Sequence, residues 1–437
     1  MALKLSVIGT GYLGATHAAA MAKMGFEVIG VDVDPAKIEM LKRGEVPFFE
    51  PDLDALLKEQ IEAGRLSFST DFALASDCDI HFICVGTPQM ENGIAADLRY
   101  VDAAFTAVAK IAKAGSLLVG KSTVPVGTAM RLSELVKGIN PDVEVAWNPE
   151  FLREGFAVED TLRPTRLVVG VTSDRAEAIL KEVYAVNLSE QTPWIRADLP
   201  TAELVKVAAN SFLATKISFI NAMAEICDAS GGDVTVLAKA IGYDPRIGNR
   251  FLQAGIGFGG GCLPKDIRAF MARADELGAH ESLEFLREID SINTRARNKM
   301  INVVRRELGE DLSGKKIGVL GAAFKPDSDD VRDSPALDIA SQLLAAGADL
   351  KIHDPKAAEP AKKRFPSLSF VETVDEVFDG AELVLHLTEW KQYRAIDPTV
   401  VKSLVKSPIM IDGRNMLDMD LWASAGWRIH AVGRTSR

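Results

Sequence analysis

In this 437-residue sequence, one cysteine follows a run of glycines and has neighbours that could make it reactive. In GFGGGCLPKD (residues 257–266) four glycines precede Cys262, and Pro264, Lys265 and Asp266 follow it. Pro264 is typical of the first turn of a helix, and the residues after it have helical spacing. Cys262 would then lie just outside a helix N-terminus, where the helix dipole and Lys265 favour the thiolate. The pattern predicts a nucleophile. The alternative is a buried, inert thiol, which suits the other cysteines better.

A second chemical pattern, GTGYLG at residues 9–14, lies between an apolar segment and an alanine-rich one. A GxGxxG turn between a strand and a helix is typical of a βαβ unit that binds a dinucleotide. Asp32 ends the next predicted strand, where a carboxylate would hold the ribose 2′-hydroxyl and repel a 2′-phosphate. The pattern therefore predicts NAD rather than NADP. A tight turn without a ligand is the alternative.

The strand and helix patterns around these residues predict an α/β protein. We expect two doubly wound (Rossmann-like) parallel-sheet domains, joined by a central helical domain with a long connecting helix. KKIGVLGAAFKPDSDD, ADLKIHDP and GAELVLHLTEW repeat the N-terminal strand-and-turn pattern, while residues 201–230 and 281–309 have helical spacing. The second turn, residues 321–325, lacks the second and third glycines, so we expect it to bind something other than a dinucleotide. The expected domains are residues 1–200, 201–300 and 301–437.

Composition excludes several classes of protein. The net charge of −11 argues against nucleic acid or an anionic membrane as the main partner. The four cysteines lack metal-ligand or disulfide-framework spacing, so we expect no metal site and a reducing, cytoplasmic location. No run of residues is long and apolar enough for a signal peptide or a membrane span.

Several motifs occur together in one order along the chain: GTGYLG, CVGTP, KSTVPVGT, NPEFLREG, ELVKVAANSFLATKISF, GFGGGCLPKD and LGAAFKPDSDDVRDSP. In these motifs the sequence resembles the UDP-glucose/GDP-mannose 6-dehydrogenase family, and DPRIGNRFLQAGIGFGG resembles its UDP-glucose branch. The resemblance implies an NAD-dependent four-electron oxidation of UDP-glucose to UDP-glucuronate, through a thiohemiacetal and a thioester on Cys262.

Other functions remain open at this point. The same chemistry could act on dTDP-glucose, GDP-mannose or a UDP-N-acetylhexosamine. A non-catalytic protein that binds NAD and a nucleotide sugar would not need a nucleophile. A two-electron hydroxyacid dehydrogenase would need neither the cysteine loop nor a third domain.

The resemblance also implies a set of site residues. In the catalytic set, Lys206 and Asp266 manage protons and a bound water, and Lys206 also stabilises an oxyanion. The whole catalytic set is Cys262, Lys206, Asp266, Asn210, Glu150 and Thr123. The implied NAD contacts are Gly9, Gly11, Tyr12, Leu13, Gly14, Asp32, Lys37, Thr87, Thr123, Glu154, Lys265 and Arg332. The implied substrate contacts are Glu150, Phe151, Leu152, Arg153, Glu154, Lys206, Asn210, Arg246, Phe251, Gly257, Phe258, Gly259, Phe324, Lys325 and Arg414.

Less specific interpretations exist for some of these residues. Lys206 could be a solvated helix lysine, although its neighbours are apolar. Glu150 and Glu154 could cap a helix start, and each arginine could be an ordinary surface residue. The sequence also departs from the family pattern, with Gly261 where serine is usual and Ala222 where glutamate is common.

Residues 204–226 are apolar on more of the helix circumference than one packing face requires. A helix of this kind must be buried on more than one side, so we expect a homodimer or a higher homo-oligomer. The resemblance implies the same and places Arg246 in a neighbouring subunit's substrate site. The alternative is that the flanking α/β domains cover both faces of the helix.

Overall fold

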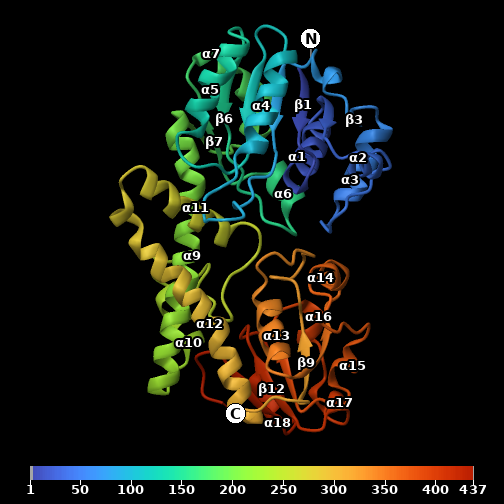
Figure 1. The fold of residues 1–437 in the computed structure, drawn as a ribbon, viewed down its shortest axis with the longest axis vertical. Coiled ribbons are helices and arrows are strands. Elements are labelled where there is room, and N and C mark those ends of the chain that lie inside the picture. Colours follow the sequence, from blue (N-terminus) through green and yellow to red (C-terminus); the bar gives the residue numbers. More distant parts are fainter. Residues whose placement is uncertain (1–2, 437) are drawn as a thin grey trace. The chain divides into compact units, whose positions relative to one another are not determined.

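The computed structural model describes residues 3–436 and divides into two compact units. The first unit runs up to Ala209 and includes Arg268–Gly278; the second contains Asn210–Ile267 and the chain from Ala279 onward. Figure 1 labels many of the helices and strands of both units. Each unit contains a β-sheet and its own hydrophobic core.

The first unit is built on an eight-stranded sheet with the order β3-β2-β1-β4-β5-β6-β7-β8. Its strands are β1 (Lys4–Ile8), β2 (Glu27–Val31), β3 (Leu66–Ser69), β4 (Ile80–Ile83), β5 (Leu117–Gly120), β6 (Glu144–Trp147), β7 (Leu167–Gly170) and β8 (Trp194–Ala197). Strands β1 to β6 pair in parallel, which confirms the doubly wound sheet. Strands β6 and β7 pair antiparallel through Trp147 and Gly170, so the last two strands run the other way. An antiparallel neighbour needs no crossover helix.

Helices cover this sheet, and α1 packs closely on it because it is rich in alanine and its residues Gly14 to Ala22 are buried. The helices of the first unit are α1 (Tyr12–Lys23), α2 (Pro35–Lys42), α3 (Leu53–Glu62), the 3₁₀ helix η1 (Phe72–Ala75), α4 (Arg99–Ile111), α5 (Thr128–Ile139), α6 (Ala157–Leu162), α7 (Asp174–Val183) and α8 (Ala185–Ser189).

The second unit contains a five-stranded parallel sheet with the order β10-β9-β11-β12-β13. Its strands are β9 (Lys316–Leu320), β10 (Asp349–His353), β11 (Leu383–His386), β12 (Ile409–Asp412) and β13 (Arg428–Ala431). The helices around it are α13 (Pro335–Ala345), α14 (Ala358–Arg364), α15 (Val374–Phe378), α16 (Lys391–Arg394), α17 (Pro398–Val401) and α18 (Met419–Ser424). This sheet confirms the second doubly wound domain.

The predicted long helices are present with small shifts of their ends. Residues 201–230 lie in α9 (Leu199–Ser230), and residues 281–309 form the 3₁₀ helix η2 (His280–Leu283) followed by α12 (Glu284–Leu308). Two further helices complete the fold, α10 (Val234–Gly242) and α11 (Leu263–Glu276). The boundary between the compact units falls inside α9 and inside α11, so the division into three domains stays a prediction.

Two features are absent from residues 3–436. No helix among them has the length and hydropathy needed to cross a bilayer. No group of three or more His, Cys, Asp and Glu side chains in the same residues is placed to hold a metal ion.

Candidate active site

The glycine-rich turn of the first unit joins β1 to α1. Gly9 has a φ of +85°, and a Cβ at Gly14 would lie 1.8 Å from the Gly9 carbonyl oxygen. Only glycine therefore allows α1 to begin this close to β1. A Cβ at Gly11 would meet nothing within 4 Å, so the turn leaves open space beside its backbone, and α1 starts at Tyr12. This cradle at a helix N-terminus fits the pyrophosphate of a dinucleotide.

Asp32 follows β2, and its carboxylate faces the same turn. It accepts hydrogen bonds from the backbone N–H of Thr10 at 2.7 Å and from Lys37 Nζ at 2.9 Å. Burial acts to raise the pKa of Asp32, but the Lys37 ammonium and the amides of Thr10 and Asp34 outweigh burial and hold the pKa below its usual value. The carboxylate is therefore ionised at neutral pH, as a ribose-binding acid must be.

The segments after β4 and β5 carry Thr87 and Thr123. These strands are parallel neighbours, so both segments leave the same edge of the sheet. Thr87 Oγ1 donates to the Thr123 carbonyl oxygen at 2.8 Å, and Ser122 Oγ donates to the Val85 carbonyl oxygen at 2.6 Å. These hydrogen bonds hold the two predicted threonines side by side.

Glu150 lies in the segment after β6, and its carboxylate is held from two sides. Oε1 accepts from the backbone N–H groups of Phe151 at 2.6 Å and Leu152 at 2.9 Å. Oε2 lies 3.3 Å from Nζ of the buried Lys121, which donates to Asn148 Oδ1 at 2.9 Å. Burial acts to lower the pKa of Lys121, but nearby acidic groups that include Glu150 raise it overall. Lys121 therefore provides a permanent positive charge beside Glu150.

Phe151 lies next to two cations. The Arg166 guanidinium carbon is 3.9 Å from the centroid of the phenyl ring, and Lys206 Nζ is 5.6 Å from it. Both contacts lie within the range of a cation–π interaction. The predicted residues Glu150, Phe151 and Lys206 are thereby brought together in the first unit.

Glu203 lies about one helical turn before Lys206 on α9 and caps another helix. Its carboxylate accepts from the backbone N–H groups of Gly127 at 2.7 Å and Ala129 at 2.6 Å, at the start of α5. Burial raises the pKa of Glu203 to about 7, against the opposing effect of these two amides. The start of α9 is therefore attached to the segment that carries Thr123.

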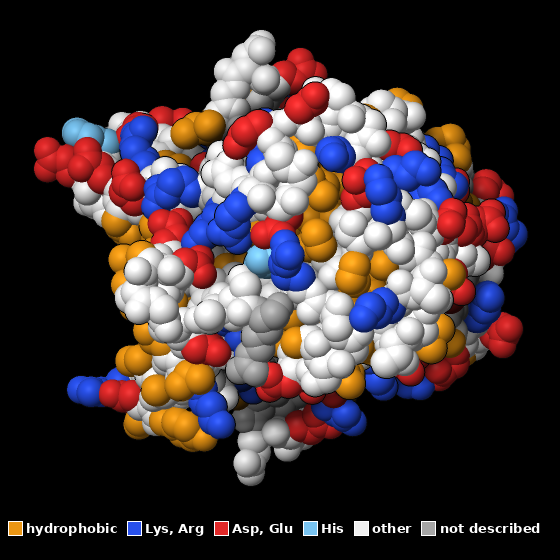
Figure 2. Space-filling view, turned by 90° about the horizontal axis from the view of Figure 1, so that it is seen from below, with side chains coloured by type: hydrophobic (Ala, Val, Ile, Leu, Met, Phe, Trp, Pro, Cys, Tyr) orange, Lys and Arg blue, Asp and Glu red, His pale blue; other side chains and the backbone are white. Residues whose placement is uncertain are grey.

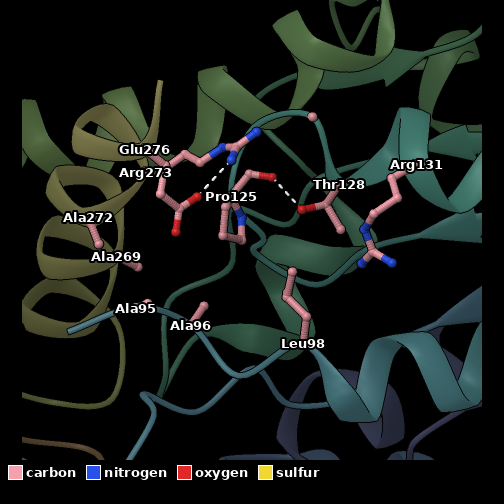
Figure 3. Close-up of a pocket in the computed structure, with 11 residues that line it drawn as sticks. Ala95, Ala96, Leu98, Pro125, Thr128, Arg131, Ala269, Ala272, Arg273 and Glu276 are labelled. Carbon is pink, nitrogen blue, oxygen red and sulfur yellow. Dashed lines mark hydrogen bonds and ion pairs between the residues drawn. The ribbon is translucent and has the colours of Figure 1, made fainter. Parts of the chain in front are cut away.

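A cavity of about 160 Å³ lies beside that segment in the first unit (Figure 3). Residues 95–98, the start of α5 and the part of α11 near Arg273 line it. Arg273 Nε donates to the Val126 carbonyl oxygen at 2.8 Å. Arg273 Nη1 lies 2.7 Å from Glu276 Oε2, and Figure 3 marks this ion pair. The segment after Thr123 is thus fixed by α11 as well as by α9.

The second unit holds the cysteine. Cys262 is exposed and immediately precedes α11, as predicted. Its carbonyl oxygen accepts from the backbone N–H of Asp266 at 2.9 Å. The Asp266 carboxylate is only 2% exposed; its Oδ2 accepts from Asn210 Nδ2 at 2.7 Å, and its Oδ1 lies 2.7 Å from Lys265 Nζ. Four of the predicted residues therefore lie together at the start of α11, where Asn210 and Lys265 contact the Asp266 carboxylate and Cys262 is joined to Asp266 through the backbone.

The four glycines before Cys262 are explained by close approach of other groups. A Cβ at any of them would lie less than 3 Å from another atom, so a side chain at any of these positions would force its neighbours to shift. Gly257 and Gly260 also have positive φ, +91° and +83°. The nearest groups are Asn293 for Gly257, the backbone of Asp333 for Gly259, the ring of Phe324 for Gly260 and the guanidinium of Arg332 for Gly261.

Phe324, Lys325 and Arg332 lie between β9 and α13. Lys325 Nζ is 5.6 Å from the centroid of the Phe324 ring. The Arg332 guanidinium forms a two-point ion pair with Asp330, at 2.9 Å from Nε and 2.7 Å from Nη2. The Phe324 ring and the Arg332 guanidinium both face the glycine segment, so this loop forms one wall beside Cys262 in the second unit.

Arg414 follows β12, and its guanidinium binds backbone carbonyl groups. Nε donates to Leu387 at 2.7 Å, Nη1 to Gly257 at 3.2 Å and Nη2 to Phe324 at 3.0 Å. Arg414 therefore joins the glycine segment to the loop that contains Phe324. A contact between Arg414 and a nucleotide sugar stays a prediction.

Three other predicted substrate residues have exposed side chains. Arg246 is 87% exposed and pairs with Asp244, and Arg153 pairs with Asp160. Phe251 is 41% exposed, at a φ of +63°. Their roles in substrate binding also stay predictions.

The chain is similar to one known protein family along most of its length. Residues 3–187 match the NAD binding domain of the UDP-glucose/GDP-mannose dehydrogenase family, residues 200–295 its central domain and residues 318–419 its UDP binding domain. The chain is 40% identical to a UDP-glucose 6-dehydrogenase of Rhizobium meliloti (strain 1021), over 99% of this chain and 100% of that protein. The chain belongs to the UDP-glucose/GDP-mannose dehydrogenase family.

Other family members agree with this result. The UDP-glucose 6-dehydrogenase TuaD of Bacillus subtilis (strain 168) is 39% identical over 99% of this chain and 93% of its own length. A UDP-glucose dehydrogenase structure from Pyrobaculum islandicum superposes with a TM-score of 0.90 at 36% identity, covering 100% of this chain and 98% of that one. These matches confirm the predicted family, the fold class and an NAD-dependent dehydrogenase, and the glycine cradle and Asp32 fit that cofactor.

Sequence reasoning missed two residues that hold the predicted family site in place. Lys121 pairs with Glu150, and Glu50 accepts hydrogen bonds from Tyr12 Oη and from the backbone N–H groups of Gly155 and Ala157. A signal for Lys121 was available, since a lysine directly after a buried strand needs a charge partner. No local signal marks Glu50, because its partners lie far from it in the sequence.

Proposed function

We propose that this protein oxidises the C6 alcohol of UDP-glucose to the carboxylate of UDP-glucuronate, with two NAD consumed per sugar. The observation that carries this proposal is the exposed Cys262 directly before α11, whose first turn carries Lys265 and the buried Asp266 that Asn210 contacts. An enzyme that stops at the aldehyde would need no such thiol, whereas a thiolate that captures the aldehyde allows a second oxidation.

The reaction balances as two hydride losses and one hydrolysis. NAD, when bound, accepts a hydride at its nicotinamide ring. The alcohol first loses a hydride and a proton to give an aldehyde, and the Cys262 sulfur adds to the aldehyde carbon. The resulting thiohemiacetal loses a second hydride and a proton to give a thioester. Water then displaces the sulfur, which leaves the carboxylate and a thiol.

The other predicted residues divide the remaining work. Asp266 and Lys206 hold and move protons, and the ammonium of Lys206 also stabilises oxyanion charge on the reacting carbon. The Glu150 carboxylate, whose Oε2 lies 3.3 Å from Lys121 Nζ, serves as the base that activates water. Asn210 orients Asp266 through its hydrogen bond, and Thr123 orients the water.

The choice of UDP-glucose is supported by the names of the relatives, which are UDP-glucose 6-dehydrogenases. A structure of similar fold from Pyrococcus horikoshii, 25% identical, is named a UDP-D-ManNAc dehydrogenase. This neighbour shows that the fold accommodates other nucleotide sugars, which the test must therefore include.

One assay tests the reaction and the substrate together. The purified protein is mixed with NAD and, separately, UDP-glucose, dTDP-glucose, GDP-mannose and a UDP-N-acetylhexosamine, and both NADH and product are quantified. We expect two NADH and one UDP-glucuronate per UDP-glucose. Cys262→Ser should abolish steady turnover, and Cys78→Ser, at a buried cysteine, is the control. One NADH with a stable aldehyde, no turnover, or a faster reaction with another sugar would refute the proposal.

We infer that the active form is at least a homodimer, assembled through α9 and α10. Phe212, Phe219 and Ile226 are 67%, 46% and 61% exposed, and their spacing of seven residues places them on one face of α9. Val236 and Tyr243, at α10 and its C-terminal end, add exposures of 65% and 77%. Figure 2 shows orange hydrophobic side chains along its left edge, which is the side on which Figure 1 labels α9 and α10. Apolar patches of this kind mark interfaces.

The dimer is tested by substitution on this face. Phe219→Glu should shift the molar mass measured by light scattering from that of an oligomer toward that of one chain. Val400→Glu, which changes an exposed apolar residue of α17, is the matched control and should have no effect. A fully active wild-type monomer would refute the dimer and, with it, the role of Arg246 at a neighbour's site.

We also infer a reducing compartment, the cytoplasm. All four cysteines are thiols in the structure, and the three other than Cys262 are buried. Fractionation of the source cells with detection of the protein tests this inference, and recovery in a secreted fraction would contradict it.

A further inference from the structure

The backbone of Phe258, four residues before Cys262, is bound on both of its polar groups by one side chain of α12. The N–H of Phe258 donates to Asn293 Oδ1 at 2.8 Å, and its carbonyl oxygen accepts from Asn293 Nδ2 at 3.0 Å. Asn293 is 2% exposed, so both hydrogen bonds are shielded from water. A side chain that pairs with both groups of one residue fixes the path of the backbone there.

Arg297, one turn further along α12, extends this contact. Its Nη2 donates to the same Phe258 carbonyl oxygen at 3.1 Å, and its Nη1 donates to Asp333 Oδ1 at 2.9 Å and lies 3.2 Å from Asp338 Oδ2. The guanidinium is largely buried, with 10% of the side chain exposed, and is paired with two carboxylates. α12 therefore holds the glycine segment and the 324–334 loop in one arrangement.

The other side of the segment is also held. The N–H of Gly260 donates to the Arg332 carbonyl oxygen at 2.9 Å, and Arg414 Nη1 binds the Gly257 carbonyl oxygen at 3.2 Å. Glycines at 257, 259, 260 and 261 give the segment the backbone freedom that would otherwise let it adopt many conformations. The contacts from α12 and from the facing loops remove that freedom just before the nucleophile.

We propose that Asn293 is a positioning residue for Cys262. By pairing with both backbone groups of Phe258 it selects the conformation of residues 257–262 that places the sulfur at the N-terminus of α11. Asn293 does not touch the reacting atoms; it acts through the backbone. The proposal rests on the nucleophilic role of Cys262 given above, and its test uses a readout that does not depend on turnover.

The test compares Asn293→Ala and Asn293→Asp with the wild-type protein by the rate at which iodoacetamide alkylates Cys262. The rate is followed by mass spectrometry from pH 5 to pH 10. Asn293→Ala leaves the buried N–H of Phe258 without its acceptor, and the segment gains freedom. A cysteine that leaves the helix N-terminus loses thiolate stabilisation, so we expect the alkylation midpoint to rise by about half a pH unit or more.

Turnover provides the second readout. We expect kcat of Asn293→Ala to fall about tenfold or more, with KM for NAD changed less than twofold, because the NAD cradle lies in the other unit. Asn293→Asp keeps an acceptor for the Phe258 N–H but not the donor to its carbonyl oxygen. Its kcat and its alkylation midpoint should therefore lie between those of Asn293→Ala and the wild type. Asn298→Ala, an exposed asparagine of the same helix, is the matched control and should match the wild type.

Each outcome decides the proposal. A folded Asn293→Ala protein with the wild-type alkylation profile and kcat would overturn it, as would a loss of thermal stability alone. If Asn293→Ala does not fold, Asn293→Asp carries the same two measurements. Full turnover by Cys262→Ser would refute the proposed function instead, and the alkylation profiles would still show whether Asn293 positions the thiol.

Discussion

The turn after the first strand of each sheet serves a different purpose in the two units. In the first unit, the turn after β1 leaves space beside Gly11, and α1 begins at once at Tyr12. In the second unit, the turn after β9 is Gly321-Ala322-Ala323, and both alanines are fully buried. The next helix, α13, begins only at Pro335.

The aspartate after the second strand of each sheet shows the difference most clearly. Asp32 accepts a hydrogen bond from one backbone N–H of its turn, that of Thr10. Asp354 Oδ2 accepts two, from Ala322 at 2.8 Å and Ala323 at 3.0 Å, and also the Trp390 indole N–H at 3.1 Å. The backbone N–H groups of the second turn thus donate to Asp354, a carboxylate of the protein itself.

Both turns follow the first strand of a parallel pair, so the difference between them lies in their residues and in what their amides bind. The first turn keeps its helix N-terminus open for pyrophosphate. In the second turn, the equivalent backbone N–H groups already donate to Asp354, and the turn continues into a loop that contains Phe324, Lys325 and Arg332. This loop belongs to the region that matches the UDP binding domain of the family.

The largest expected effect comes from Asp354→Ala. The amides of Ala322, Ala323, Lys356 and Ala357 would lose their acceptor, so we expect the free energy of unfolding to fall by about 3–5 kcal/mol. Denaturant unfolding measures this change. Asp349→Ala, at the exposed start of the same strand β10, is the control. A loss below about 1 kcal/mol would show that Asp354 does not hold the second turn together.

Gly14→Ala should break the first turn. The new Cβ would lie 1.8 Å from the Gly9 carbonyl oxygen, so α1 must move away and the cradle must widen. We expect NAD affinity to fall about 100-fold, roughly 2.7 kcal/mol, as measured by calorimetry. Gly138→Ala in α5, where a Cβ meets nothing within 4 Å, should bind NAD as the wild type does. Equal affinities in both variants would contradict a pyrophosphate site at this turn.

Asp32→Ala tests whether the Asp32 carboxylate selects NAD over NADP. Without the carboxylate, a 2′-phosphate is no longer repelled, so the preference for NAD over NADP in kcat/KM should fall about tenfold, or roughly 1.4 kcal/mol. The control is Asp34→Ala, which removes the N-cap of α2 but leaves the carboxylate at the turn. An unchanged preference in Asp32→Ala would place the ribose elsewhere.

The smallest expected effect is on acid stability. The pKa of Asp32 is lower in the folded protein than its ordinary value, so its contribution to stability is present above pH 4 and is lost as the pH falls through the folded pKa. Between pH 5 and pH 3, wild-type protein should therefore lose about 1 kcal/mol more than Asp32→Asn. Thermal unfolding at several pH values measures this, and parallel curves would show that Lys37 does not stabilise the Asp32 charge.

Much of the fold could be predicted because its signals are local. The GTGYLG turn, the alanine-rich α1 and Pro264 in the first turn of α11 are patterns within a few residues of each other. The reversed pair β7 and β8 was not predicted, since strand direction depends on how the chain returns to the sheet. The residues of the site could be named by motif, but their partners Glu50 and Asn293 could not. Lys121 carried a weaker signal, that of a lysine directly after a buried strand.

The sequence by itself determined the turn that fits NAD, the long helices and a cysteine at a helix start, because backbone preferences and helix ends depend on neighbouring residues. Only the tertiary structure decided which groups hold these features. The distances from Lys121 to Glu150, from Asn293 to Phe258 and from Asp354 to Ala322 are set by the packing of whole elements. Each pair is separated by 29 or more positions in the sequence, and no pattern within one element contains both members.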